Sequence, residues 1–180
     1  MTPATYEKDA DVTIDKAALG NAVKAVAAAA HADDAAALYQ AVMPPAGTKT
    51  PPAEAAAWFG TLLIHLALTA ATDSRLARGT SREAVSGWIG EQLGPPPTPA
   101  RLRAEDPGRI DHLQAVSLAE SYSQCREYAT DLIGIGLADP DEAPAERAIN
   151  AHCTVTNDKD TRITVMAMLG RLAADPRGRD

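Results

Sequence analysis

Residues 50–73, with the sequence TPPAEAAAWFGTLLIHLALTAATD, constrain the fold more than any other part of the chain. No residue between Glu54 and Asp73 carries a formal charge when histidine is taken as neutral. At about 100° per residue, the polar side chains of this stretch fall in one narrow arc and apolar side chains fill the rest. A helix that is apolar over most of its circumference is usually buried. We therefore expect a buried central helix over about residues 51–73.

The narrow polar arc of this helix has two interpretations. Its threonines can donate to backbone carbonyls one turn earlier and leave a strip that faces solvent. Alternatively, His65 and its neighbours line a cavity and bind a small molecule, together with side chains from the longest later helix. On that second interpretation, the candidate pocket residues are Trp58, Thr61, His65, Thr69, Tyr122 and Cys125.

The central stretch is only marginally long enough to cross a membrane. Its many alanines, Glu54, His65 and the lack of a basic flank favour a helix in water. The first residues, MTPATYEKDADV, include acidic side chains and lack the apolar core of a signal peptide. The two cysteines have no spacing typical of a disulfide framework or a metal site. These features predict a cytoplasmic protein without membrane contact and with free thiols.

The remaining chain is typical of an all-α protein. Only 4% of the residues are aromatic, and few segments alternate β-branched or aromatic residues with polar ones, so no sheet is expected. Apolar residues instead recur three and four positions apart. We predict a single-domain helical bundle of about six to seven helices, with a polar tail at 1–11 and a charged tail at 176–180.

A proline-rich segment at residues 94–99, GPPPTP, is the strongest interruption of the helical pattern. Consecutive prolines favour an extended conformation and cannot lie inside a helix. The segment is either a strap across one bundle formed by residues 12–175 or a linker between halves 12–93 and 100–175. We favour the single bundle, because each half alone would have a poor core.

Two helix starts are predicted from capping residues. Thr50 followed by Pro51 is typical of an N-cap and a first helical residue. Thr80 and Glu83 fit a capping box, in which the two side chains and two backbone N–H groups bond reciprocally. Gly94 should end the helix that follows.

The longest helix is predicted to start with Asp106 as its cap. Its apolar stripe contains Ala115, Leu118, Tyr122, Cys125, Ala129 and Leu132. The opposite side carries Glu120, Glu127 and Asp131, which are weak candidates for a divalent-cation site because hard cations prefer several oxygen ligands. A solvated acidic face explains the same row, and we predict neither a metal nor a cofactor.

The sequence contains no motif that identifies a reaction. The net charge of −7 argues against nucleic-acid binding, which depends on basic side chains that neutralise phosphates. None of the four histidines stands four residues from another on one helix, so a common zinc-binding spacing is missing. No catalytic residue is predicted.

Three functions remain on these grounds. The first is a non-enzymatic interaction protein that binds a protein partner or itself through a helix face, with Trp88 and Tyr128 as candidate contact residues. The alternative is a small-molecule-binding domain with a pocket near His65. A metal-dependent hydrolase that uses the acidic row is the third.

Overall fold

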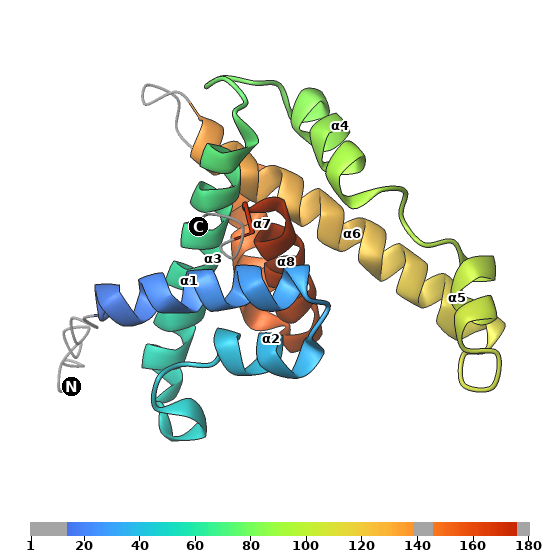
Figure 1. Ribbon diagram of the computed structural model, residues 1–180, viewed down its shortest axis with the longest axis horizontal. Coiled ribbons are helices and arrows are strands. Elements are labelled where there is room, and N and C mark those ends of the chain that lie inside the picture. The colour runs from blue at the N-terminus through green and yellow to red at the C-terminus, as the bar shows by residue number, and fades with distance from the viewer. Residues whose placement is uncertain (1–13, 139–145, 176–180) are drawn as a thin grey trace, which may run out of the picture.

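The computed structural model describes residues 14–138 and 146–175, and all regular structure within them is helical. The all-α prediction is confirmed, with eight α-helices in the described ranges rather than six to seven. Both predicted tails lie outside these ranges. The elements are α1 (Lys16–His31), α2 (Ala35–Val42), the 3₁₀ turn η1 (Gly47–Lys49), α3 (Pro52–Ser74), α4 (Arg82–Leu93), α5 (Pro99–Glu105), α6 (His112–Leu137), α7 (Glu146–Asn157) and α8 (Lys159–Leu172) (Figure 1).

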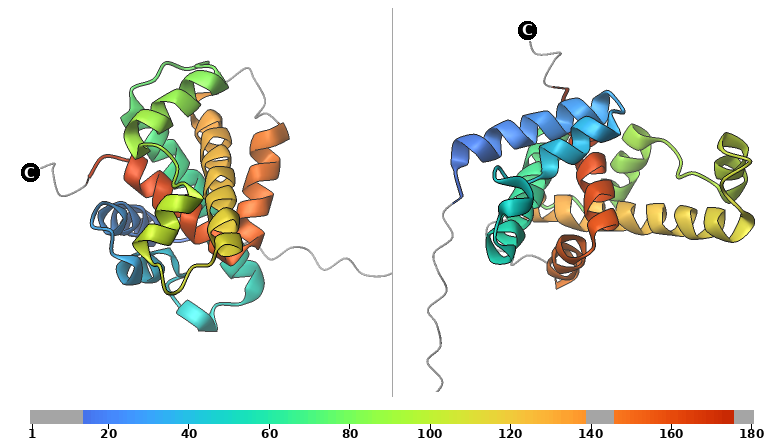
Figure 2. Two further views of the ribbon diagram at one scale, coloured as in Figure 1. Left: turned by 90° about the vertical axis from the view of Figure 1, so that its right-hand side faces the viewer. Right: turned by 90° about the horizontal axis from the view of Figure 1, so that it is seen from below.

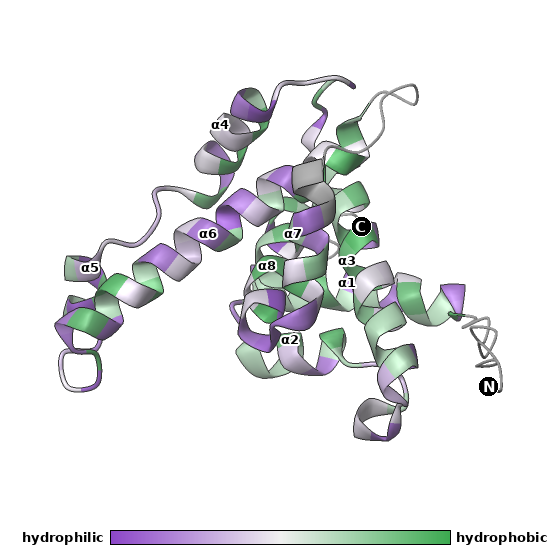
Figure 3. Cartoon of the chain, turned by 180° about the vertical axis from the view of Figure 1, so that it is seen from behind, coloured by the Kyte–Doolittle hydropathy of each residue, from purple (hydrophilic) through white to green (hydrophobic). Residues whose placement is uncertain are grey.

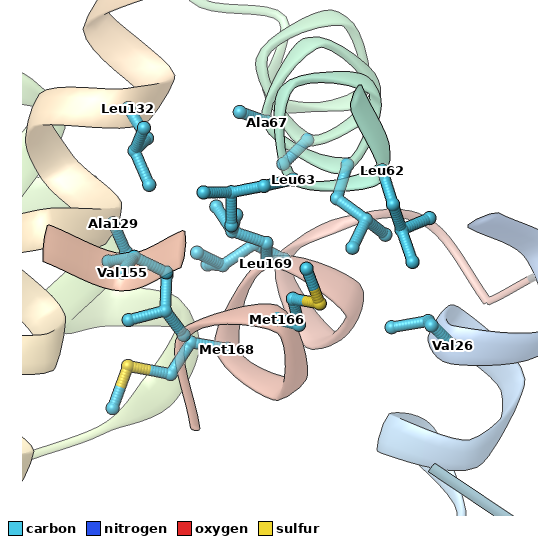
Figure 4. Packing of buried hydrophobic residues seen from close by; sticks show 14 of the residues in the cluster. Val26, Leu62, Leu63, Ala67, Ala129, Leu132, Val155, Met166, Met168 and Leu169 are labelled. Carbon is cyan, nitrogen blue, oxygen red and sulfur yellow. The ribbon is translucent and has the colours of Figure 1, made fainter. Parts of the chain in front are cut away.

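Helix α3 runs through the body of the molecule and packs against α1, α6, α7 and α8. Leu62, Leu63 and Leu66 are fully buried on it. Figure 4 shows leucines of α3 pointing toward side chains of α1, α6, α7 and α8. Length and hydropathy alone would let α3 cross a bilayer. Its eight buried residues, however, pack against other helices of this chain.

One cluster of buried apolar residues contains members from both sides of the proline-rich segment. Leu62 and Ile89 precede that segment, whereas Leu132, Met166 and Leu169 follow it, and all five belong to the cluster. The segment itself links α4 to α5 along the outside of the molecule (Figure 1). The side chains before and after it therefore share one core.

Helix α3 begins one residue later than its sequence predicts. Pro51 occupies the N-cap position and Pro52 the first helical position. The Thr50 hydroxyl, expected to cap the helix, makes no capping bond and is buried. With proline at two consecutive positions, the second can take the first helical place and the first stays extended.

Two further helix starts differ from those predicted. Ser81 rather than Thr80 caps α4, and its hydroxyl accepts from the Ala84 N–H at 3.3 Å. Asp111 rather than Asp106 caps α6. Asp111 forms a reciprocal capping box with Gln114, with N···O distances of 2.8 and 3.0 Å. A capping residue recognised from sequence thus predicts that a helix starts nearby, but neighbouring polar residues compete for the position.

Helix α5 accounts for part of the difference in helix number. Thr98 caps it by accepting from the Arg101 N–H at 3.2 Å, and Pro99 takes the first helical position. A turn closed by the Ile110 N–H on the Asp106 carbonyl then leads into α6. The last residues of the proline-rich segment therefore start a short helix.

Helix α6 is the longest element, with 26 residues, and its two ends have different surroundings. Its C-terminal half crosses α3 and carries six of its seven buried residues. Its N-terminal half extends away from the body with α5 packed beside its outer end (Figure 2, right). We call α5 and residues 112–124 of α6 the arm.

Candidate functional site

The polar strip of α3 is hydrogen-bonded within the helix. The Thr61 hydroxyl donates to the Ala57 carbonyl at 2.8 Å, and the Thr69 hydroxyl donates to the His65 carbonyl at 2.7 Å. The His65 side chain is exposed. These contacts agree with the first interpretation of the strip, in which threonines bond back to the preceding turn.

The candidate pocket residues are spread over separate parts of the described chain. Trp58 is buried, its indole Nε1 donates to the Val42 carbonyl at 3.0 Å, and it lines a small cavity beside the start of α1. Tyr122 lines a different cavity, of about 250 Å³, between α1, α2, α4, α6 and α8. His65 lines neither of these two cavities, so ligand binding by His65 stays a prediction.

Cys125 is buried in the core and is 1% exposed. Burial raises the pKa of its thiol to about 11, and the nearby Asp158 carboxylate contributes to the increase. At neutral pH the thiol is therefore protonated and a poor nucleophile. Its surroundings are those of a packing residue.

The two candidate partner residues are half-buried. Trp88 on α4 and Tyr128 on α6 both pack against the apolar core. Each therefore already fills space inside the protein. A role for either at a partner surface stays a prediction.

The acidic row on α6 contacts an arginine. Arg82 at the start of α4 forms ion pairs with Glu127 and, at 2.6 Å, with Asp131. Glu120 is exposed. Within the described ranges, no three histidine, cysteine or acidic side chains are grouped so that they could hold a metal ion. Glu127 and Asp131 thus connect α6 to α4.

Burial and ion pairing act in opposite directions on Asp131. Its side chain is only 12% exposed. Burial raises the pKa of the Asp131 carboxyl, and the Arg82 guanidinium partly opposes this increase. The hydrogen bond with Glu127 raises the pKa of Arg82. Arg82 therefore helps the Asp131 carboxylate to remain charged in a mostly buried position.

The arm exposes apolar side chains that no helix of the described chain covers. Leu113 is 78% exposed and Leu118 is 49% exposed, and Ala115 is the only buried residue between residues 112 and 124. Hydrophobic colour appears at the outer end of α6 in Figure 3. The two leucines are five positions apart in the sequence, which places them about 140° apart around the helix. The arm is consequently apolar on more than one side.

A shallow cavity of about 370 Å³ lies beside Leu118 on this arm. It is formed where the turn before α6 meets the first two turns of that helix. Its lining combines apolar and polar side chains, and the residues are Arg109, Ile110, Gln114, Ser117 and Leu118.

The sequence does not predict the arm. The buried stripe expected for the long helix includes Leu118, which is instead half exposed. Leu113 lies outside that stripe. An apolar residue outside the stripe is the one feature of the sequence that indicates an exposed apolar surface on this helix. Periodicity shows which residues share a face and not where a helix leaves the core, so it cannot reveal an arm.

Comparisons with protein-family models, with curated proteins and with solved structures found no match for the chain.

Proposed function

We propose that this protein is a non-enzymatic interaction protein that binds another protein chain through the arm. The exposed leucines of α6, Leu113 and Leu118, carry the proposal. An exposed apolar surface is energetically unfavourable in water, at about 25 cal/mol per Å². A partner chain that packs around the arm and covers Leu113 and Leu118 would remove that surface from water.

The charge of the arm is compatible with this role. The arm contains two basic residues, Arg101 and Arg103, and two acidic residues, Glu105 and Glu120, so its formal charges sum to zero. The whole chain carries −7. A neutral segment of an acidic protein can approach a second acidic surface without strong repulsion. A second copy of the chain is therefore the first partner to test.

Association would be measured by sedimentation velocity over a concentration series of the full chain. Leu113→Asp is the informative variant, because Leu113 is largely exposed and sits in the first turn of α6. An acidic side chain in the first turn interacts favourably with the positive end of the helix dipole, so the monomer of this variant should still fold. We expect the variant to weaken association by about tenfold or more.

Gln40→Glu is the matched control, since it adds one negative charge at an exposed position on α2, away from the arm. It should leave association unchanged. A second measurement tests for a partner other than a second copy of the chain. Wild type and the Leu113→Asp variant would each be crosslinked to proteins of a cell extract, and the crosslinked proteins would be compared. The proposal fails if two results are found together. The chain is monomeric at about 100 µM, and every protein that crosslinks to wild type also crosslinks to the Leu113→Asp variant.

A further inference from the structure

A second site lies on the opposite part of the molecule, in a cavity of about 270 Å³. It forms where the turn η1 and the end of α2 meet the first half of α3 and the start of α8. Most of its wall is apolar, including Val42, Phe59 and Ile163. Two basic side chains, Lys159 and Arg162, also line it.

Two buried polar atoms of this lining have no hydrogen-bond partner in the described part of the chain. They are the hydroxyl oxygen of Thr50 and the Nε of Arg162. Each buried group without a partner costs about 1–3 kcal/mol. Such groups are uncommon in native proteins, and two at one cavity indicate a missing partner.

The Arg162 guanidinium is held in place by other contacts. It stacks on Phe59, with 3.7 Å from the guanidinium carbon to the ring centroid. Its Nη1 donates to the Thr156 carbonyl at 3.1 Å. Burial lowers the pKa of Arg162, which reflects the cost of keeping this charge away from water. The Nε–H is therefore held beside the cavity, where it is buried.

Nearby acidic and basic groups leave the cavity with positive charge. The Asp158 carboxylate caps α8 by accepting from the Thr161 N–H at 2.9 Å, and it offsets part of the positive charge of Arg162. The Lys159 ammonium lies 5.1 Å from the centroid of the Tyr39 ring, which is also part of the lining. Two cations at one apolar cavity in a chain of net charge −7 favour an anionic ligand.

We propose that this cavity binds a small organic carboxylate. After a small shift of the two buried side chains, the carboxylate would accept from the Arg162 Nε–H and the Thr50 hydroxyl and would lie near the Lys159 ammonium. The apolar body of the ligand would contact the Phe59 side of the wall. The cavity is at the small end of ligand sites, which span about 300–1,000 Å³, so the ligand is a short-chain or single-ring acid.

Benzoate is a suitable probe, with benzyl alcohol as its neutral analogue and inorganic phosphate as an anion without an apolar body. The Arg162 Nε–H signal in a ¹⁵N-edited NMR spectrum reports directly on the proposed bond. Titration with benzoate should shift this signal with saturation. Benzyl alcohol and phosphate should each bind at least about tenfold more weakly.

Thr50→Val and Lys159→Gln test the two other proposed contacts. Thr50→Val preserves the side-chain shape, and Lys159 is exposed, so neither should unfold the protein. Each should weaken benzoate binding by about three- to tenfold. Lys24→Gln, which removes an exposed charge on α1, is the control and should bind as wild type does.

Three results would overturn the proposal. The first is no shift of the Arg162 signal at about 10 mM benzoate, a concentration that would detect even millimolar affinity. The second is equal binding of benzyl alcohol, which would indicate an apolar hole without anion recognition. The third is tighter binding of phosphate than of benzoate. None of them bears on the arm, which lies on other helices.

Discussion

A Cβ atom placed on Gly136 would lie 2.7 Å from the Cβ of Ala71 and 3.5 Å from the Cα of Leu68. Gly136 is in the last turns of α6, and Ala71 is near the end of α3. The two helices therefore approach too closely here for any side chain on α6. This crossing joins the central helix to the longest helix.

Gly136→Ala should destabilise the protein by about 1–2 kcal/mol. Overpacking costs about 1–3 kcal/mol, whereas alanine in a helix gains up to about 1 kcal/mol over glycine. Gly134→Ala is the matched control, because a Cβ there meets no atom within 4 Å. Urea unfolding followed by circular dichroism would show Gly134→Ala as neutral or stabilising.

A compensating change tests the cause of that effect. Ala71→Gly removes the methyl group that a Cβ at position 136 would meet. Combined with Gly136→Ala, it should recover part of the lost stability in a double-mutant cycle. Strict additivity of the two changes would show that the contact is not responsible.

Arg82→Met should destabilise the protein by about 1–3 kcal/mol at neutral pH, because it removes the cation beside the mostly buried Asp131 carboxylate. Glu127 is half exposed, with 50% of its side chain accessible. Glu127→Gln should therefore cost less than about 1 kcal/mol. Both losses would be measured by urea unfolding at pH 7. Equal losses of unfolding free energy in the two variants would contradict the inference that the Arg82–Asp131 pair stabilises the protein more than the Arg82–Glu127 pair does.

The effect of Arg82→Met should also depend on pH. The pKa of Asp131 is already raised by burial, and removing Arg82 raises it further. The folded variant then binds a proton more readily than the unfolded chain, so its relative stability increases as pH falls through the titration of Asp131. The difference between wild type and variant should be larger at pH 7 than near pH 4. If the difference in stability between wild type and variant instead grew as the pH fell, the inferred direction of the pH dependence would be wrong.

The two cysteines should react at very different rates. Cys153 is exposed, whereas Cys125 is buried with its pKa raised to about 11. At pH 8 only about one Cys125 thiol in a thousand would be ionised even with full access. A disulfide reagent should label one thiol per chain quickly in the native state and both in urea. Rapid labelling of two native thiols would place Cys125 in an open segment.

The arm should be less protected from hydrogen exchange than the rest of α6. Only Ala115 is buried between residues 112 and 124, whereas residues 125–137 contribute six buried residues to the core. Amides of the arm should therefore exchange about 100-fold faster or more than those of residues 125–137. Because a partner would cover the arm, exchange should be measured at low protein concentration. Equal protection along α6 in a monomeric sample would be inconsistent with a free arm.

The residue pattern alone predicts the all-helical class and a buried helix over residues 51–73. Helical periodicity and the lack of charge between Glu54 and Asp73 require burial of one face whatever the neighbours are. The sequence also located helix starts to within a few residues, as at Thr80 and Asp106. It could not choose among nearby capping residues. Ser81 can cap a helix as well as Thr80 can, and Asp111 as well as Asp106, so packing decides which residue takes the position.

Packing between helices that are distant in the sequence sets where α6 leaves the body and which polar groups meet. Leu113 and Leu118 are exposed because α5 covers only part of the first half of α6. Arg82 and Asp131 meet because α4 and α6 pack together, and Thr50 and Arg162 line one cavity although they are far apart in the chain. Such contacts join distant residues, and periodicity along one helix carries no information about them.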